Sequence, residues 1–313
     1  MAALVSLSTA AALRRFAAAR TAGNPAATPA YRLLGLQAAL IVALVPVLGF
    51  GVDVHDFGVM LVALAGAVAL ALAMRWCRFG RAADALEASA LIVASGMAAG
   101  CLSVLLATTA APFRDTTLAA ADRLLFPFLS WPAMAHDLGG SPRLVAAMGE
   151  VYSTLTWQPF ALAALLAAAG RGDALWRFAH AWLLALMLCL AVFALAPAVT
   201  AQVHYGFAMR DIAGLHVNAG WRPTVILTDV RSGTLTTLAS GSMTGLIDFP
   251  SFHAAGATLL GWAALRAGRF GWPLLALNLA IIPTIPLIGS HYFIDVVAGV
   301  AVAALAIRAT RTA

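Results

Sequence analysis

Three polar side chains, His253, His291 and Asp295, stand at the starts of two apolar segments near the end of this 313-residue chain. His291 and Asp295 are four residues apart, so on a helix they share one face and lie within reach of each other. A carboxylate there accepts the Nδ1 proton of the imidazole and leaves Nε2 free as a nucleophile. His253, at a helix start that favours an anionic phosphate, supplies a separate acid or base. The three residues therefore predict nucleophilic catalysis with proton transfer.

Each of these residues also has a simpler interpretation. A single His near a membrane interface is usually a partnered polar side chain or an anchor, and an Asp four residues from a His fits an ordinary pair on a helix surface. Ionisable residues in apolar segments are costly, however, and indicate function by default. Two such clusters at helix starts favour catalysis over these alternatives.

The elements that must position these residues are membrane-spanning helices. Hydrophobic residues make up 62% of the chain and charged residues 10%, which excludes a soluble globule. A helical span needs about 20 mainly apolar residues, and eight segments approach that length: 33–51, 57–74, 88–110, 144–169, 175–198, 250–266, 272–289 and 291–308. We therefore expect an all-α, polytopic membrane helix bundle of about eight spans.

The arginine residues predict how these spans are oriented. Residues 1–32 form a basic tail without the apolar core of a secretory signal peptide. If this tail is cytoplasmic, most arginines fall in the tail or in loops on the same side, as the positive-inside rule requires. We expect both termini to be cytoplasmic, in a bacterial inner membrane, and residues 33–110 to form N-terminal spans.

The 38 residues from His253 to His291 fit one crossing inward, a short turn and one crossing back. Both histidines then face the outer, periplasmic side. Two long segments, 111–143 and 199–249, lie on that side as well, and the first is amphipathic, as in a helix that lies on the membrane surface.

Composition also limits the partners. The net charge is +6, but all basic residues are Arg and no basic run carries interleaved aromatic residues, so nucleic acid is not expected. Cys77, Cys101 and Cys189 are odd in number and widely spaced, which fits neither a disulfide framework nor a metal site. The bilayer itself and a membrane-borne substrate are the partners we expect. The oligomeric state is not determined.

Two motifs resemble those of a known family. Pro250-Ser251-Phe252-His253 and Gly289-Ser290-His291-Tyr292-Phe293-Ile294-Asp295 are similar to the second and third signature motifs of the type-2 phosphatidic acid phosphatase superfamily. They most resemble its inositol phosphorylceramide synthase-like branch, with Phe-Pro-Ser-x-His and His-Tyr-x-x-Asp. The similarity covers about residues 115–308 and includes softer matches at Asp122-Arg123-Leu-Leu, at Tyr152 to Gln158, and at Arg231-Ser-Gly-Thr-Leu.

The resemblance implies a fold and a mechanism. A phosphatase-like catalytic domain would span residues 111–313, with a six-helix core in the C-terminal two thirds of the chain. His291 would attack phosphorus and form a phosphohistidine, Asp295 would orient it, and His253 would protonate the leaving oxygen and then deprotonate the acceptor. Ser251 and Tyr292 would contact the substrate. The mechanism implied uses no metal and no cofactor.

The chain departs from the family pattern where cations are expected. The first motif is Lys-x6-Arg-Pro in soluble and phosphatase members, but the position seven before Arg222 is Leu215. The third motif has Ser-Arg ahead of the His, where this chain has Thr284 and Ile285. Phosphoryl transfer still needs positive partners, so Arg222 and Arg231 are the candidates, because guanidinium binds two phosphate oxygens at once.

Three classes of function follow from these patterns. A lipid phosphotransferase of the inositol phosphorylceramide synthase type passes a phosphate-bearing group from a phospholipid to a hydroxyl acceptor. A plain lipid phosphatase hydrolyses phosphatidate, phosphatidylglycerol phosphate or polyprenyl pyrophosphate. A proton-coupled transporter would distribute polar residues through the depth of several spans, whereas here they collect at one rim, as in an enzyme. The intact catalytic residues also argue against an inactive scaffold.

Overall fold

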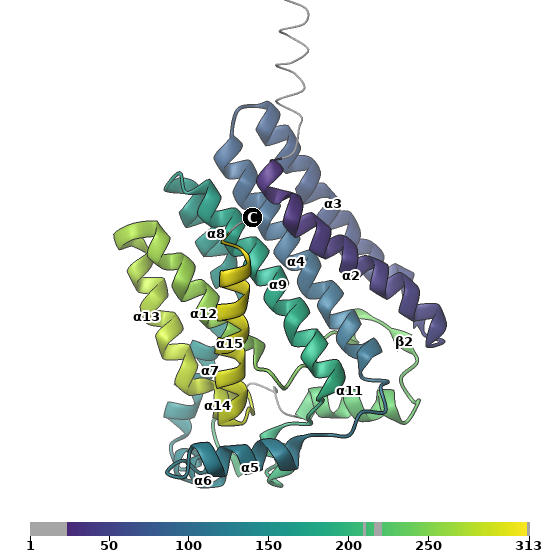
Figure 1. The fold of residues 1–313 in the computed structure, drawn as a ribbon, viewed down its shortest axis with the longest axis vertical. Coiled ribbons are helices and arrows are strands. Elements are labelled where there is room, and N and C mark those ends of the chain that lie inside the picture. Colours follow the sequence, from purple (N-terminus) through teal and green to yellow (C-terminus); the bar gives the residue numbers. More distant parts are fainter. Residues whose placement is uncertain (1–23, 209–210, 216–220, 312–313) are drawn as a thin grey trace, which may run out of the picture.

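The computed structural model describes residues 24–208, 211–215 and 221–311, and it forms a bundle of long apolar helices with shorter helices across one end (Figure 1). The expected all-α membrane bundle is confirmed. Most of the expected basic tail, residues 1–23, lies outside the described residues. The first span begins at Thr28, before the expected residue 33, because Asn24 and Pro25 start a short 3-10 turn that leads directly into it.

The helices of the N-terminal half and the middle of the chain are η1 (Pro25–Ala27), α2 (Thr28–Val47), α3 (Val54–Trp76), α4 (Gly80–Leu106), α5 (Asp115–Leu125), α6 (Trp131–Gly139), α7 (Pro142–Ser153), η2 (Thr154–Thr156), α8 (Gln158–Ala168) and α9 (Gly172–Leu195). They are followed by α10 (Ala201–His204), α11 (Trp221–Arg231), η4 (Ser240–Ser242), α12 (Phe252–Ala264), η5 (Leu265–Gly271), α13 (Trp272–Ile281), η6 (Ile282–Thr284), α14 (Ile285–Ile288) and α15 (Phe293–Ala309). One parallel two-residue pairing joins β1 (Gly51–Val52) to β2 (Thr237–Leu238).

Each of the eight apolar segments is helical, but they differ in length and continuity. Within the described residues, five runs are long and apolar enough to cross a membrane: Pro25–Val47, Val54–Trp76, Gly80–Leu106, Gly172–Leu195 and Phe252–Ile288. The segment from α7 to α8 makes a sixth if its 52° bend is counted within one span. The run Phe252–Ile288 contains two expected spans, because the chain reverses at Gly268 (φ 64°) and α12 packs beside α13. Helix α15, with 17 residues, is the eighth expected segment.

Helices α9 and α12 lie inside the bundle. Helix α9 buries Phe178, Leu183 and Phe193 completely and contacts α4, α12 and α15. Helices α12 and α15 approach very closely, since a Cβ on Gly299 would stand 2.2 Å from the carbonyl oxygen of Ser251. Small residues allow such backbone contacts between membrane helices, and this contact brings the start of α12 beside the start of α15.

The N-terminal helices α2, α3 and α4 pack on the side of α9 (Figure 1). The Arg75 side chain joins α3 to α4 through ion pairs with Asp84 and Glu87, and Tyr31 of α2 donates to Glu87. Helices α2 and α3 expose apolar side chains such as Val42 and Val62, each 74% exposed, on their outer faces. An exposed surface of this kind matches the hydrocarbon of a bilayer.

Helices α5 and α6 lie across the end of the bundle, at the bottom of Figure 1, where α11 also lies. They occupy most of the segment expected on the membrane surface. Trp131 of α6 is buried and donates from Nε1 to the carbonyl oxygen of Pro286, so this layer is fixed to α14, which leads into the loop that carries His291.

Candidate active site

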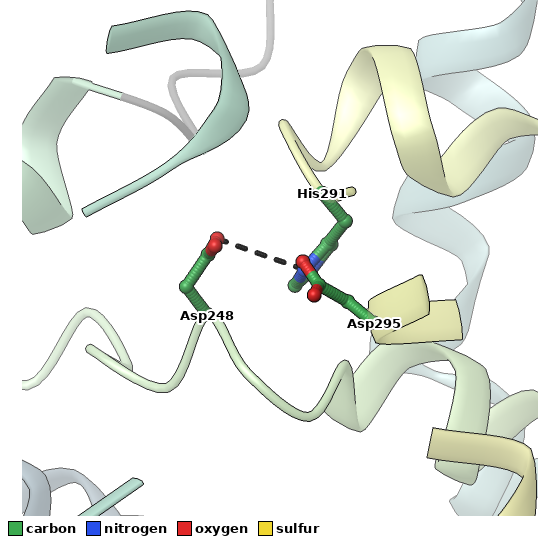
Figure 2. A group of neighbouring side chains, drawn as sticks. All are labelled: Asp248, His291 and Asp295. Atoms are coloured by element: carbon green, nitrogen blue, oxygen red, sulfur yellow. Dashed lines mark ion pairs between the residues drawn. The ribbon is translucent and has the colours of Figure 1, made fainter. Parts of the chain in front are cut away.

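His291 lies close to two carboxylates, those of Asp295 and Asp248 (Figure 2). Its Nδ1 atom is 3.4 Å from Asp295 Oδ2 and 3.6 Å from Asp248 Oδ1. All three side chains are buried. The four-residue spacing therefore brings His291 and Asp295 together as expected, and a second carboxylate joins them from the loop before α12. Neither carboxylate hydrogen-bonds Nδ1 among the described residues, but both are close enough to favour a proton on Nδ1 electrostatically, which leaves Nε2 as the reactive nitrogen.

The loop before α15 fixes the position of His291. Ser290 adopts a left-handed backbone (φ 62°), its carbonyl accepts from the amide of Ala201, and its Oγ accepts from the amide of Gln202. Gly289 is required here, because a Cβ on it would stand 2.8 Å from Cδ2 of His291 and 3.0 Å from the ring of Tyr152. A larger residue would push the imidazole out of place.

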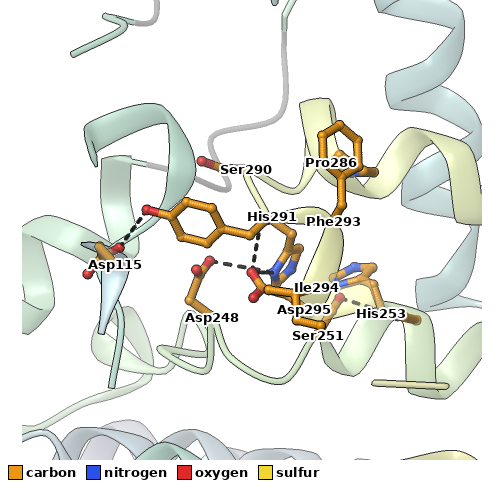
Figure 3. A network of polar contacts seen from close by, with 12 residues as sticks. Asp115, Asp248, Ser251, His253, Pro286, Ser290, His291, Phe293, Ile294 and Asp295 are labelled. Atoms are coloured by element: carbon orange, nitrogen blue, oxygen red, sulfur yellow. Dashed lines mark hydrogen bonds and ion pairs between the residues drawn. The ribbon is translucent and has the colours of Figure 1, made fainter. Parts of the chain in front are cut away.

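The first turn of α15 is capped by carboxylates. Asp122 of α5 accepts from the amides of Phe293 and Ile294, and Asp295 Oδ2 accepts from the amide of Tyr292. Tyr292 in turn donates from its hydroxyl to Asp115 (Figure 3). These amide donors are occupied by the protein itself, so the start of α15 does not offer them to a phosphate.

His253 belongs to the first turn of α12. Its Nδ1 and the Tyr152 hydroxyl are joined by a 3.0 Å hydrogen bond, and the two rings stack with their centroids 4.0 Å apart. Ser251 is fully buried and caps α12 by accepting from the amide of Ala254, while its own amide donates to the carbonyl of Asp295. Ser251 thus links the two helices that carry His253 and His291.

Both histidines line one cavity of about 110 Å³. Its wall also includes Tyr152, Asp248 and Thr244, and the buried Thr244 hydroxyl has no hydrogen-bond partner among the described residues. Tyr292, which was expected to contact the substrate, is fully buried and is not among the lining residues. The cavity offers two imidazoles, a carboxylate and a free hydroxyl at one point.

The two candidate arginines lie outside this wall. Arg231 donates to the carbonyl oxygens of Ala107 and Ala111, and its guanidinium stacks on Phe113 at 3.9 Å. Arg222 donates to the carbonyl oxygen of Gly241. Among the described residues that line the cavity there is no Arg. Phosphate binding by Arg222 and Arg231 stays a prediction, and Arg231 would have to leave its two carbonyl partners to take part.

Burial changes the pKa values of Asp248 and His291 and therefore the charges in the site. It raises the pKa of the Asp248 carboxyl well above its usual range, against the opposing effect of His291, and the nearby Asp295 and Asp115 carboxylates raise that pKa further. Burial also lowers the pKa of His291, although the Asp248 carboxylate counteracts this shift. A neutral His291 is therefore favoured near pH 7, which is the form that can act as a nucleophile.

The same three side chains also have the spacing of metal ligands. One ligand atom from each of Asp248, His291 and Asp295 lies within 4.8 Å of the others. Oxygen and imidazole nitrogen are donors that a divalent cation accepts. No metal was expected from the sequence, and the geometry is compatible with either a shared proton or a cation at this point.

Sequence reasoning missed Asp248 and gave no role to Tyr152, Asp115 or Asp122. Asp248 stands two residues before Pro250 and so adjoins the motif, which is a signal that could have drawn attention to it. Asp122 and Tyr152 fall in the softer family matches. Asp122 contacts Phe293, 171 positions away, and Tyr152 contacts His253, 101 positions away. No local pattern in the sequence indicates such pairs.

Comparison with known proteins gives one match. The family model described as the PAP2 superfamily matches residues 116–309, which is more than half of the chain. This range contains all of the site residues just described except Asp115. No curated protein and no solved structure matches the chain.

Proposed function

The chain belongs to the PAP2 superfamily, and on that premise we propose that it is a membrane enzyme that transfers the phosphate of a lipid through a phosphohistidine at His291. Family membership supports a phosphatase-type enzyme acting on a lipid phosphate. The observation that carries the finer proposal is the position of His291 close to Asp295 and Asp248, in a cavity that His253 shares.

In the first step, the Nε2 lone pair of His291 attacks phosphorus and the bond from phosphorus to the leaving oxygen breaks. His253, as an imidazolium, gives its Nε2 proton to that oxygen. Tyr152 accepts from Nδ1 of His253 in this scheme, which keeps the reactive proton on Nε2. Positive charge that develops on His291 is balanced by Asp295 and Asp248.

In the second step, the neutral His253 takes a proton from an acceptor hydroxyl, whose oxygen attacks the phosphohistidine. The nitrogen–phosphorus bond breaks and its electron pair returns to His291. With water as acceptor the enzyme is a lipid phosphatase acting on phosphatidate, phosphatidylglycerol phosphate or polyprenyl pyrophosphate. With a lipid or sugar hydroxyl as acceptor it is a phosphotransferase like inositol phosphorylceramide synthase. The residues of the two motifs favour this second reaction.

The orientation forms part of the proposal. The site lies at the end of the bundle to which the C-terminal end of α4 and the N-terminal ends of α12 and α15 point (Figure 1). The arginine distribution supports assigning this end to the periplasmic face of an inner membrane. The substrate phosphate would then be held at the level of the headgroups.

The test is trapping of a phosphoenzyme with purified protein and a phosphate-labelled phosphatidate, in the presence of EDTA. We expect acid-labile label on the protein, accumulation of that label in His253→Asn, and none in His291→Asn. Turnover should fall on the order of 10⁴-fold or more in His291→Asn, since the nucleophile is lost, and by about 10²-fold or more in His253→Asn.

His136→Asn is the matched control, because His136 is exposed on α6 and distant from the cavity lining. It should keep full activity. Label that persists in His291→Asn contradicts the phosphohistidine, and turnover that EDTA abolishes and a divalent cation restores shows that Asp248, His291 and Asp295 hold a metal. Phosphate release without any alcohol acceptor selects the phosphatase over a strict transferase.

A further inference from the structure

A second and larger cavity adjoins the catalytic one. It has a volume of about 470 Å³, which lies in the range of ligand-binding pockets. Its wall is almost entirely apolar and is formed by α4, η2, α8, α9, α12 and the loop before α12. Representative lining residues are Ile92, Leu155, Phe160, Trp182, Leu186 and Phe252. We call this cavity the apolar chamber.

The apolar chamber meets the catalytic cavity at four shared residues, Thr244, Gly245, Ile247 and His253. A molecule that places a phosphate against His291 and His253 therefore has an apolar space directly beside it. The other residues that line the chamber are almost all apolar. The Thr156 hydroxyl already donates a hydrogen bond to the carbonyl of Ser153, so it is not available to a ligand. Such a space suits hydrocarbon and not a sugar or an alcohol.

One wall of the chamber comes from outside the family match. Helix α4 ends at Leu106, before the matched residues 116–309 begin, and it contributes Ile92, Val93, Gly96, Ala99 and Gly100. From Gly100, which packs on Met243, to Ile92 the helix runs about 12 Å at 1.5 Å per residue. Val93 is 38% exposed and Gly96 is also exposed. The chamber therefore opens sideways, where lipid surrounds the bundle.

We propose that the apolar chamber binds an aliphatic chain of the lipid phosphate substrate, and that α4 makes this chain part of substrate selection. The proposal rests on the proposed function for its substrate, and it adds a role for a helix that the family match does not include. The chain passes between α4 and α8 from the bilayer, and its phosphate end reaches His253. Apolar burial along the wall supplies binding energy that a short, chain-free phosphate ester lacks.

Gly96 is the position at which this proposal is best tested. A Cβ there meets nothing within 4 Å, so a larger side chain enters the chamber without disturbing the packing of α4. Gly96→Leu should lower kcat/KM for dioleoyl phosphatidate about tenfold or more. The same variant should leave kcat/KM for phenyl phosphate, which has no aliphatic chain, unchanged within about threefold.

Gly66→Leu is the matched control. Gly66 is an exposed glycine in the middle of α3, also with nothing within 4 Å of a Cβ, and it does not line the chamber. Both variants replace a helical glycine with the same side chain in an apolar span. A selective loss with dioleoyl phosphatidate in Gly96→Leu alone supports the proposal. Equal effects on the two substrates, or equal effects of the two variants, overturn it.

Photo-crosslinking separates this inference from the proposed chemistry. Phosphatidate with a diazirine in one acyl chain should label residues of α4 between Ile92 and Gly100 or of α9 near Trp182, and Gly96→Leu should reduce that labelling. Labelling confined to other helices overturns the chamber as the chain site. Labelling in the chamber by a protein that turns over no phosphate ester keeps the chain site and rejects the catalytic proposal.

Discussion

At the scale of single residues, the unexpected member of the site is Asp248. Its Oδ1 is 3.6 Å from Nδ1 of His291, and in the part of the chain that the structure describes its buried Oδ2 has no hydrogen-bond partner. A second carboxylate near the nucleophile is costly in a site that shows no Arg in its described wall. Its electrostatic effect on His291 offsets that cost, because the carboxylate raises the pKa of the imidazole and stabilises positive charge on it.

Asp248→Asn should therefore change the pH dependence of catalysis. His291 attacks in its neutral form, so activity is lost as the pH falls through its pKa. Burial has already lowered that pKa, and loss of the Asp248 charge lowers it further. The acid limb of the profile of kcat/KM should move to lower pH, while kcat near pH 7 falls about tenfold, since charge on the attacking ring is less well balanced.

The measurement is kcat/KM against pH for the parent, Asp248→Asn and Asp173→Asn. Asp173 is exposed at the start of α9, away from the site, and serves as the control. An acid limb that stays in place or moves to higher pH in Asp248→Asn contradicts the electrostatic role of this residue.

At the scale of elements, the site depends on a helix that crosses the end of the bundle. The Asp122 carboxylate of α5 accepts hydrogen bonds from the amides of Phe293 and Ile294. It therefore caps α15 from another helix. Asp115, at the start of the same helix, accepts from the Tyr292 hydroxyl and from the amide of Val199. Helix α5 thus holds the three residues that follow His291 and connects them to the loop after α9.

Asp122→Ala should destabilise the fold and impair catalysis together. Loss of the cap costs about 1 kcal/mol or more, because two half-buried amides lose their acceptor. The first turn of α15 then loosens, and kcat should fall about tenfold as Asp295 and His291 lose their relative positions. Asp122→Asn keeps one oxygen acceptor, so its stability and its kcat should both lie between those of Asp122→Ala and those of the parent.

Thermal unfolding in detergent and steady-state kinetics check this prediction. Asp137→Ala, at an exposed position on the neighbouring helix α6, is the control and should match the parent. A normal kcat in Asp122→Ala despite a lower unfolding midpoint would show that the cap stabilises α15 without positioning the catalytic pair.

In the whole molecule, the N-terminal helices and the family-like core form one bundle. The buried ionic cluster that joins the N-terminal helices and the catalytic residues lie at opposite ends of this bundle. Arg75, Asp84, Glu87 and Tyr31 join α2, α3 and α4 at the end where α4 begins. The catalytic residues lie at the end where α4 finishes. The first cluster should therefore govern the stability of the bundle and leave the chemistry unaffected.

Arg75→Met tests this separation. Glu87 is only 3% exposed in its side chain, so loss of its cationic partner leaves a buried carboxylate unpaired. That change should cost on the order of 3 kcal/mol and lower the unfolding midpoint. At a temperature well below that midpoint, kcat with phenyl phosphate should equal that of the parent.

The control is Arg78→Met, at an exposed position three residues further along. It should leave both the midpoint and kcat unchanged. A fall in kcat for folded Arg75→Met would mean that the two ends of α4 are coupled.

The class of fold and the position of the central motifs could be predicted from local patterns in the sequence. Apolar runs of about 20 residues and the four-residue spacing of His291 and Asp295 are local properties, and the helical period turns them directly into spans and a shared face. The structure confirms the helical bundle and places His291 beside Asp295. The same local logic located the amphipathic segment that became α5 and α6.

The distant residues that complete the site are brought together by tertiary packing. Tyr152 is hydrogen-bonded to His253, 101 positions away. Asp122 accepts from Phe293, 171 positions away, and Asp115 accepts from Tyr292, 177 positions away. Arg231, the candidate phosphate ligand, donates to carbonyl oxygens beyond the end of α4, and its binding of phosphate stays a prediction. Such pairs depend on how helices pack and which loops cross the end of the bundle. The four-residue spacing of His291 and Asp295 could be read from the chain, but the second carboxylate beside them, Asp248, required the fold.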